Sequence, residues 1–149
     1  GVVYAPYLNE LYEACKGKGA MLNGRSIHVS GKNDTQESVV STGFPIDKDR
    51  NPDNNLDNLA RILPMVRGVR RQGSAAFDLC CVAAGILDGY WEFNLHLWDV
   101  CAGILIVTEA GGTVRSFRED RNVSIVAGTP AIVEQLYSRL SDKPGKICL

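Results

Sequence analysis

Two long, nearly uninterrupted apolar segments constrain the fold of this chain more than any other feature of its sequence. Residues 75–87 contain one charged side chain, and residues 99–110 contain two, one near each end. Both segments are much longer than an ordinary strand of about 5–6 residues, so they predict helices. A helix that is apolar on nearly all sides is a buried helix.

Capping residues stand at the ends of these segments. Ser74 is placed to cap the first helix, and Asp99 is predicted to be the N-cap of the second. Gly111 follows the second segment at the position where helices commonly stop. Two further helices are predicted, one by the apolar spacing within residues 52–66 and one from Pro130 onward.

Short strand-like segments alternate with these helices. They are residues 38–42, 69–72, 89–93, 113–117 and 123–127. Strands that alternate with helices predict an α/β fold, with a sheet covered by helices on its faces.

The chain divides into three parts on sequence alone. Residues 1–31 are predicted to form β-hairpin structure. Asn23-Gly24 is a strong turn signal within them, because both residues tolerate positive φ. Polar residues 31–36 mark a boundary, and residues 32–141 form the predicted carboxyl-terminal α/β domain. Residues 142–149 read as a tail.

Charge and composition exclude several classes of partner. The net charge is −1, and the densest basic cluster is Arg67, Arg70 and Arg71, without the interleaved aromatic residues of a nucleic-acid surface. No apolar run reaches the length of about 20 residues that crosses a bilayer. We therefore expect no nucleic-acid partner and no membrane. The five cysteines show no metal or redox spacing, which favours reduced core thiols in a cytoplasmic protein.

Four motifs follow one another along about residues 1–141. The first joins Gly-Val-Val-Tyr, Gly-Lys-Gly-Ala and Asn-Gly within residues 1–24, and the second is Arg-Gln-Gly-Ser-Ala-Ala at 71–76. The third is Asp-Gly-Tyr-Trp-Glu at 88–92, and the fourth runs from Trp-Asp at 98–99 to Glu-Ala-Gly-Gly at 109–112. In this order they resemble the carboxyl-terminal portion of the inositol monophosphatase family, which includes inositol-1-monophosphatases and the bacterial extragenic suppressor type.

The resemblance implies a fold, a reaction and a set of site residues. The family fold is a layered α/β/α/β/α sandwich. Enzymes of the family hydrolyse phosphate monoesters with two or three Mg²⁺ ions. By position, Asp99 matches a metal ligand near a sugar hydroxyl, and Glu92 matches the carboxylate that accepts hydrogen bonds from sugar hydroxyls. Gly73, Ser74 and Ala75 match a turn whose backbone amides touch the substrate. Taken without the resemblance, Asp99 and Ser74 are helix caps and Glu92 is a solvated carboxylate.

The resemblance also exposes an absence. The family's first signature, an Asp-Pro-x-Asp-Gly-Thr run, does not occur in the sequence. It would supply most of the metal ligands and the turn that holds the phosphate. One carboxylate competes poorly with the hydration shell of Mg²⁺, so we expect this chain alone to bind Mg²⁺ weakly and to be inactive. We expect residues 1–30 to be disordered, to self-associate, or to pair with a separate amino-terminal chain.

Three functions stay open at this point. The first is a lithium-inhibited phosphatase, homodimeric when intact, that acts on inositol monophosphate or a related sugar phosphate, fructose 1,6-bisphosphate included. The second is a phosphatase of 3′-phosphoadenosine nucleotides. The third is a non-catalytic domain that binds a partner, since some bacterial relatives in this family associate with transcription machinery.

Overall fold

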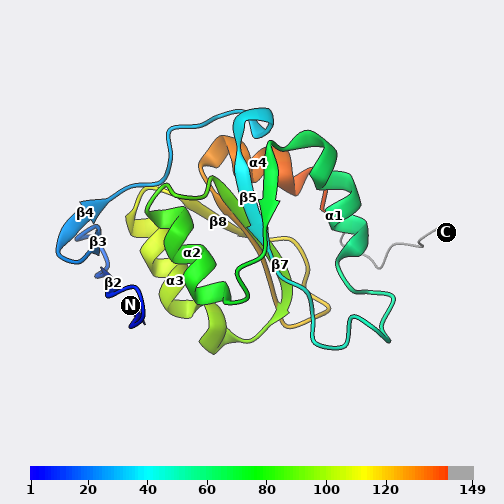
Figure 1. The fold of residues 1–149 in the computed structure, drawn as a ribbon, viewed down its shortest axis with the longest axis horizontal. Coiled ribbons are helices and arrows are strands. Elements are labelled where there is room, and N and C mark those ends of the chain that lie inside the picture. The colour runs from blue at the N-terminus through cyan, green and yellow to red at the C-terminus, as the bar shows by residue number, and fades with distance from the viewer. Residues whose placement is uncertain (141–149) are drawn as a thin grey trace.

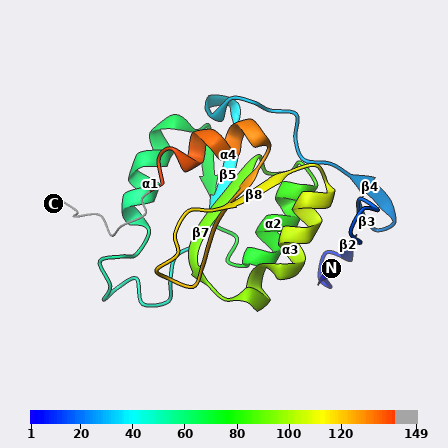
Figure 2. The same cartoon turned by 180° about the vertical axis from the view of Figure 1, so that it is seen from behind.

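The computed structural model of the chain describes residues 1–140, and in these residues four layers of secondary structure stack in the order sheet, helices, sheet, helices (Figure 1). A small amino-terminal sheet packs on one side of two buried helices, and a larger sheet packs on their other side. The remaining helices cover the far face of the larger sheet (Figure 2). This confirms the predicted α/β class with a mixed sheet flanked by helices. The predicted tail, residues 142–149, lies outside the described residues.

The larger sheet has five strands in the order β6-β5-β7-β9-β8. Their bounds are Val39–Thr42 for β5, Gly68–Arg70 for β6, Gly89–Leu95 for β7, Thr113–Ser116 for β8 and Val123–Gly128 for β9. Strand β5 runs parallel to β6 and β7, whereas β9 runs antiparallel to β7 and β8. All five strands were predicted, and their ends differ from the prediction by at most two residues.

The helices divide between the two faces of this sheet. Helix α2 (Ala75–Ala83) and helix α3 (Leu97–Glu109) lie together on one face. On the other face lie α4 (Pro130–Tyr137) and α1 (Leu56–Ile62), which continues into a 3₁₀ turn at Leu63–Met65. Another 3₁₀ turn, Thr35–Glu37, precedes β5. Each face has its own hydrophobic core, one around α2 and α3 and one around Trp91 and Ile132.

Helices α2 and α3 approach each other closely at Gly103. A Cβ built on this glycine would lie 2.7 Å from Cδ1 and 2.8 Å from Cβ of Leu79, a side chain that is fully buried. A larger residue at position 103 would therefore push the two helices apart. Among residues 1–140, no helix is long and apolar enough to cross a membrane.

The amino-terminal segment is a four-stranded antiparallel sheet, more than the hairpin remnant that the sequence suggested. Its strands are β1 (Val2–Ala5), β2 (Glu10–Ala14), β3 (Ala20–Leu22) and β4 (Arg25–Ile27), in sequence order. The extra strands arise because the chain reverses at three turns. One of these is the predicted Asn23-Gly24 turn, in which both residues have positive φ. The sheet packs its inner face on α2 and α3, so disorder is not what the structure shows.

Glu109, at the end of α3, ties the amino-terminal sheet to the buried helices. Its carboxylate accepts hydrogen bonds from the backbone amides of Gly17 (2.8 Å) and Gly19 (2.9 Å), in the turn between β2 and β3. Two of the four sequence motifs therefore meet in space. These amide bonds favour the ionised form and hold the pKa of Glu109 below its ordinary value.

We expect a Glu109→Gln variant to lose stability at neutral pH and to lose little at acidic pH. Because the pKa of Glu109 is lower in the folded state, its contribution is complete above the unfolded pKa of about 4.3 and disappears as the pH falls through the folded pKa. Urea unfolding of the variant and of the unchanged chain at pH 7 and pH 3 measures the loss of stability at each pH. Faster hydrogen exchange of the Gly17 and Gly19 amides in the variant would show that the loss arises at these hydrogen bonds. Glu119→Gln, at an exposed glutamate between β8 and β9, is the matched control. An equal loss at both pH values would contradict the assignment.

Candidate functional site

A cleft of about 570 Å³ opens where strands β5 and β7 end and helices α2 and α3 begin. Residues from four separate stretches of the sequence line it. They are Gly43, Phe44, Ile46, Arg71, Gly73, Ser74, Ala75, Ala76, Asp78, Glu92, Leu95, Trp98 and Asp99. The cleft thus brings together every site residue that the sequence predicted.

Asp99 lies in the first turn of α3, and the prediction that it is the N-cap is wrong. The helix begins at Leu97, so His96 is the N-cap and Asp99 is the third helical residue. Its Oδ2 accepts a hydrogen bond of 2.8 Å from the backbone amide of His96, which fixes the carboxylate at the helix start. The hydrogen bonds among residues 1–140 leave Oδ1 unengaged. The imidazole of His96 stacks on Trp98, with ring centroids 4.4 Å apart.

Glu92 lies on β7 and is half-buried, so it is not the solvated carboxylate that the residues alone suggested. The hydroxyl of Tyr90 donates a hydrogen bond of 2.6 Å to its Oε2. Burial is the main cause that raises the pKa of Glu92, and repulsion from the carboxylates of Asp78 and Asp99 adds to it. The pairing of β7 with β9 shifts register directly after Glu92, between Glu92 and Leu95. Such bulges are common beside active sites.

The turn at residues 73–75 leads into α2. The Ser74 hydroxyl accepts a hydrogen bond of 3.4 Å from the amide of Phe77, so its predicted capping role is present. Gly73 has a φ of +92°, and all three turn residues line the cleft. The start of a helix carries partial positive charge and free amides, which suit an anionic group. The turn can thus serve as cap and as anion contact together.

Asp78 is a third carboxylate in the cleft, and it lies outside the residues predicted from the sequence motifs. It lies in the first turn of α2, is 1% exposed, and accepts a hydrogen bond of 3.1 Å from Nε2 of Gln72. Burial raises its pKa above the ordinary value. A signal was available, since Asp78 is the single charge in the apolar segment 75–87.

Arg71 also lines the cleft, although the arginines at 67, 70 and 71 read as a solvated face in the sequence. Its guanidinium is exposed, and its positive charge lowers the pKa values of Asp78 and Glu92, against the larger effect of burial. One wall of the cleft is therefore acidic, and a single cation lies beside it.

The carboxylates fit a hard metal ion in chemistry but do not complete a site for one. Mg²⁺ takes oxygen ligands and is commonly held by one or two carboxylates together with water and a substrate phosphate. Asp99 offers an oxygen of the right kind. Within residues 1–140, however, no three His, Cys, Asp or Glu side chains are grouped to hold a metal ion. The described residues therefore offer oxygen donors in the cleft but no complete set of ligands.

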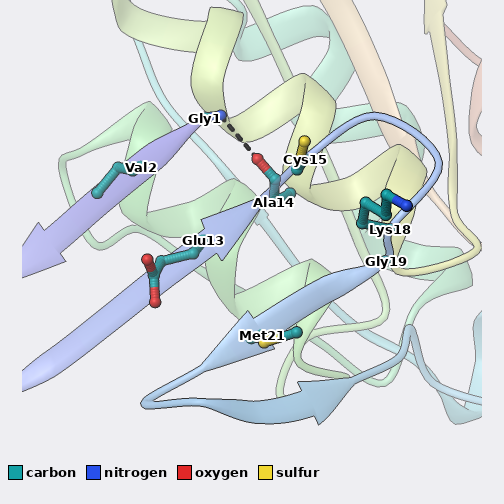
Figure 3. Close-up of a pocket in the computed structure, with 8 residues that line it drawn as sticks. All are labelled: Gly1, Val2, Glu13, Ala14, Cys15, Lys18, Gly19 and Met21. Carbon is teal, nitrogen blue, oxygen red and sulfur yellow. Dashed lines mark hydrogen bonds between the residues drawn. The ribbon is translucent and has the colours of Figure 1, made fainter.

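A second hollow of about 260 Å³ lies at the amino-terminal sheet (Figure 3). It is lined by Gly1, Val2, Glu13, Ala14, Cys15, Lys18, Gly19 and Met21. Its position is fixed by ordinary strand pairing, including a hydrogen bond of 2.8 Å from the Gly1 amino group to the Ala14 carbonyl. Glu13 is the one carboxylate among these lining residues, so the hollow lacks the clustered carboxylates of the cleft.

The sequence of this chain is similar to those of known proteins. The model of the inositol monophosphatase family matches residues 1–143. A Putative Nus factor SuhB of Neisseria meningitidis serogroup B is 43% identical over 144 residues, which cover 94% of this chain and 55% of that protein. An inositol-1-monophosphatase of Synechocystis sp. is 47% identical over 117 residues, covering 78% of this chain and 41% of that protein.

Solved structures give the same result. The structure of inositol monophosphatase from Anabaena (Nostoc) sp. superposes with a TM-score of 0.88 at 38% identity, covering 97% of this chain and 59% of that one. Mycobacterium tuberculosis SuhB superposes with a TM-score of 0.85 at 35% identity, covering 94% and 57%. The chain thus spans about half the length of the relatives it matches.

Proposed function

The chain belongs to the inositol monophosphatase family, and from this premise we propose that it forms one part of a Mg²⁺-dependent phosphatase. The substrate is inositol monophosphate or a related sugar phosphate, with fructose 1,6-bisphosphate among the candidates. The cleft between β5, β7, α2 and α3 is its share of the active site.

One observation carries the proposal. The cleft places acidic side chains, which suit a cation, beside an amide-bearing turn at a helix start, which suits an anion. These groups come from residues 73–78, 92 and 99, and only folding brings them together. A metal-assisted attack on a phosphate monoester needs both kinds of group next to each other.

Asp99 is the residue of this chain that would hold Mg²⁺. The His96 amide fixes one carboxylate oxygen, and Asp99 lines the cleft. The chemistry that bound Mg²⁺ supplies to such a reaction is activation of the attacking water and stabilisation of charge on the leaving oxygen. Holding the carboxylate in one orientation lowers the cost of assembling that site.

Glu92 and the 73–75 turn would hold the substrate at its two ends. An ionised carboxylate accepts several hydrogen bonds, which suits the neighbouring hydroxyls of a polyol. The Tyr90 hydroxyl keeps the carboxylate of Glu92 in place. The amides of Gly73, Ser74 and Ala75 face an anionic or polar group of the same substrate.

We expect this chain alone to release little or no phosphate, because residues 1–140 group no three His, Cys, Asp or Glu side chains around a metal ion. The longest product that the gene encodes is expected to release phosphate from inositol 1-phosphate in the presence of Mg²⁺. The measurement compares the two proteins on inositol 1-phosphate, fructose 1,6-bisphosphate and 3′-phosphoadenosine 5′-phosphate, and calorimetry measures the Mg²⁺ affinity of this chain.

Each outcome of that comparison has a definite meaning. Activity on the nucleotide alone would replace the sugar phosphatase by the nucleotide phosphatase. Micromolar affinity of this chain for Mg²⁺ would contradict the expectation that its metal site is incomplete. Failure of both proteins on all three substrates would remove the main support for catalysis.

A role in binding a partner without catalysis is the second candidate. It is favoured by the name Putative Nus factor SuhB, which the Neisseria relative carries. A complex with a partner protein that forms equally well without Mg²⁺ and phosphate would support it. The proposed assembly of the phosphatase is a homodimer of the intact protein, or a pairing of this chain with a separate amino-terminal chain.

A further inference from the structure

Gly43 and the carboxyl group of Glu92 meet just beyond the last residue pair of β5 and β7, where β5 ends and β7 continues. In the pairing of β5 with β7, Thr42 lies opposite Trp91, so the next residues of the two strands, Gly43 and Glu92, are neighbours. Both line the cleft. A Cβ built on Gly43 would overlap the carboxyl carbon and both carboxyl oxygens of Glu92. The Glu92 carboxylate therefore fills the space that any side chain at position 43 would need.

Backbone conformation does not explain why position 43 is a glycine. The φ angle of Gly43 lies outside the left-handed region that favours glycine, so other residues could adopt the same backbone. A side chain at position 43 is therefore opposed by crowding alone, and the group that causes the crowding is a carboxylate of the proposed site.

A buried hydrogen-bond network prevents the backbone at Gly43 from moving away. Asn55, 3% exposed, donates from Nδ2 to the Gly43 carbonyl (2.6 Å) and to Oγ1 of Thr42 (2.9 Å). Its Oδ1 accepts a hydrogen bond of 3.0 Å from Nε1 of Trp91, and Oγ1 of Thr42 donates to the Trp91 carbonyl (2.6 Å). The network ties the end of β5 to the strand that carries Glu92.

The Glu92 carboxylate thus has two close neighbours, the backbone of Gly43 and the Tyr90 hydroxyl. We propose that Gly43, held by the Asn55 network, is a positioning residue that sets where the Glu92 carboxylate meets the sugar hydroxyls of the substrate. The inference rests on the proposed function, in which Glu92 accepts hydrogen bonds from the polyol.

The proposal predicts how the molecule relieves the crowding in a Gly43→Ala variant. The Gly43 backbone is tied by buried hydrogen bonds, whereas the Glu92 carboxyl is the far end of a flexible side chain. The carboxylate is therefore displaced and the fold is kept. The effect falls on substrate recognition, which separates it from an ordinary core substitution.

The kinetic test uses the longest form of the protein with Mg²⁺. Gly43→Ala is expected to lower kcat/KM for inositol 1-phosphate by about tenfold to a hundredfold, mainly through KM, because hydrogen bonds to a charged group are lost. Hydrolysis of p-nitrophenyl phosphate, which has no sugar hydroxyls, is expected to fall by a much smaller factor than hydrolysis of inositol 1-phosphate, and an equal fall for both substrates would overturn the proposal. Gly31→Ala is the matched control, since a Cβ on Gly31 meets open space.

A rescue variant distinguishes positioning from general damage. Glu92→Asp shortens the side chain by one methylene and withdraws the carboxylate from the space beside position 43. In the Glu92→Asp background, Gly43→Ala is expected to cost less than about twofold in kcat/KM. A further loss as large as in the wild type would overturn the proposal, because the carboxylate of Glu92 would then not be the group displaced.

Carboxyl ¹³C NMR of this 149-residue chain tests the placement without Mg²⁺ or turnover. In Gly43→Ala, the Glu92 signal is expected to shift and to titrate closer to the ordinary pKa of a glutamate, while Gly31→Ala leaves it unchanged. An unchanged Glu92 titration in Gly43→Ala would overturn the proposal. If the signal moves but no form of the protein is a phosphatase, the positioning stands and the proposed function fails.

Discussion

Replacing Asp99 by Asn in the longest form of the protein is expected to lower kcat for inositol 1-phosphate by roughly two to three orders of magnitude. A metal ion contributes several kcal/mol of transition-state stabilisation, and each 1.36 kcal/mol changes a rate tenfold. Asn keeps the size of the side chain and an oxygen that can accept the His96 amide bond, but it removes the charge that holds Mg²⁺. Steady-state phosphate release at saturating Mg²⁺ measures the loss.

The controls separate loss of the metal ligand from loss of the helix cap. Because the capping acceptor remains, the free energy of unfolding of Asp99→Asn should change by less than about 1 kcal/mol. Asp49→Asn is the matched control, since its side chain is 69% exposed and pairs with Arg50 outside the cleft. Full activity of Asp99→Asn would exclude Asp99 as a metal ligand.

A Trp91→Ala variant is expected to lose about 3–5 kcal/mol of stability, the usual cost of removing a large aromatic side chain from a core. Trp91 is fully buried between β7 and the layer of α1 and α4. Its loss also removes the hydrogen bond from Nε1 to Asn55. This loss is a large part of the total stability of a domain, about 5–15 kcal/mol. Since each kcal/mol lowers the midpoint of thermal unfolding by a few degrees in a chain of this size, the midpoint should fall by roughly 10 °C.

The chain offers a matched control in its only other tryptophan. Trp98 is 76% exposed, so Trp98→Ala in this 149-residue chain should change the free energy of unfolding by less than about 1 kcal/mol. Urea unfolding of both variants, followed by circular dichroism, gives the comparison. Equal losses in the two variants would mean that Trp91 is not packed as the structure shows.

The arrangement of helices and strands was predictable because burial leaves a clear mark on a sequence. The long apolar segments 75–87 and 99–110 are the buried helices α2 and α3, and the strands between and after them form the larger sheet. Helix ends were harder to place. Helix α2 stops at Ala83, where Gly85 adopts a φ of +69° and its amide bonds to the Val82 carbonyl, although the apolar run continues to Leu87.

The predicted N-cap at Asp99 failed for a related reason. Asp is favoured both at the N-cap and at the third helical residue, where it bonds back to the cap amide. Sequence alone could not separate these positions, because Leu97 and Trp98 continue the helix toward the amino terminus although both side chains are exposed. The motif nevertheless placed Asp99 in the right cleft.

Long-range contacts account for the site residues that sequence reasoning missed. Gly43 lies 49 residues from Glu92, and its importance becomes visible only once β5 and β7 pair in their observed register. Asp78 carried a local signal as the single charge in an apolar helix, but its partners come from the fold. Residues that act through neighbours distant in sequence leave no short motif.

The packing of the amino-terminal sheet on α2 and α3 also sets an order for folding during synthesis. Strands β1 to β4 are complete by residue 27, but the helices that cover their inner face end at residue 109, 82 residues later. At about 5–20 residues per second, ribosomal synthesis leaves that face uncovered for roughly 4–16 seconds. The buried side chains of Tyr12 and Ala20 are therefore exposed to chaperones and to other nascent chains until α3 has emerged.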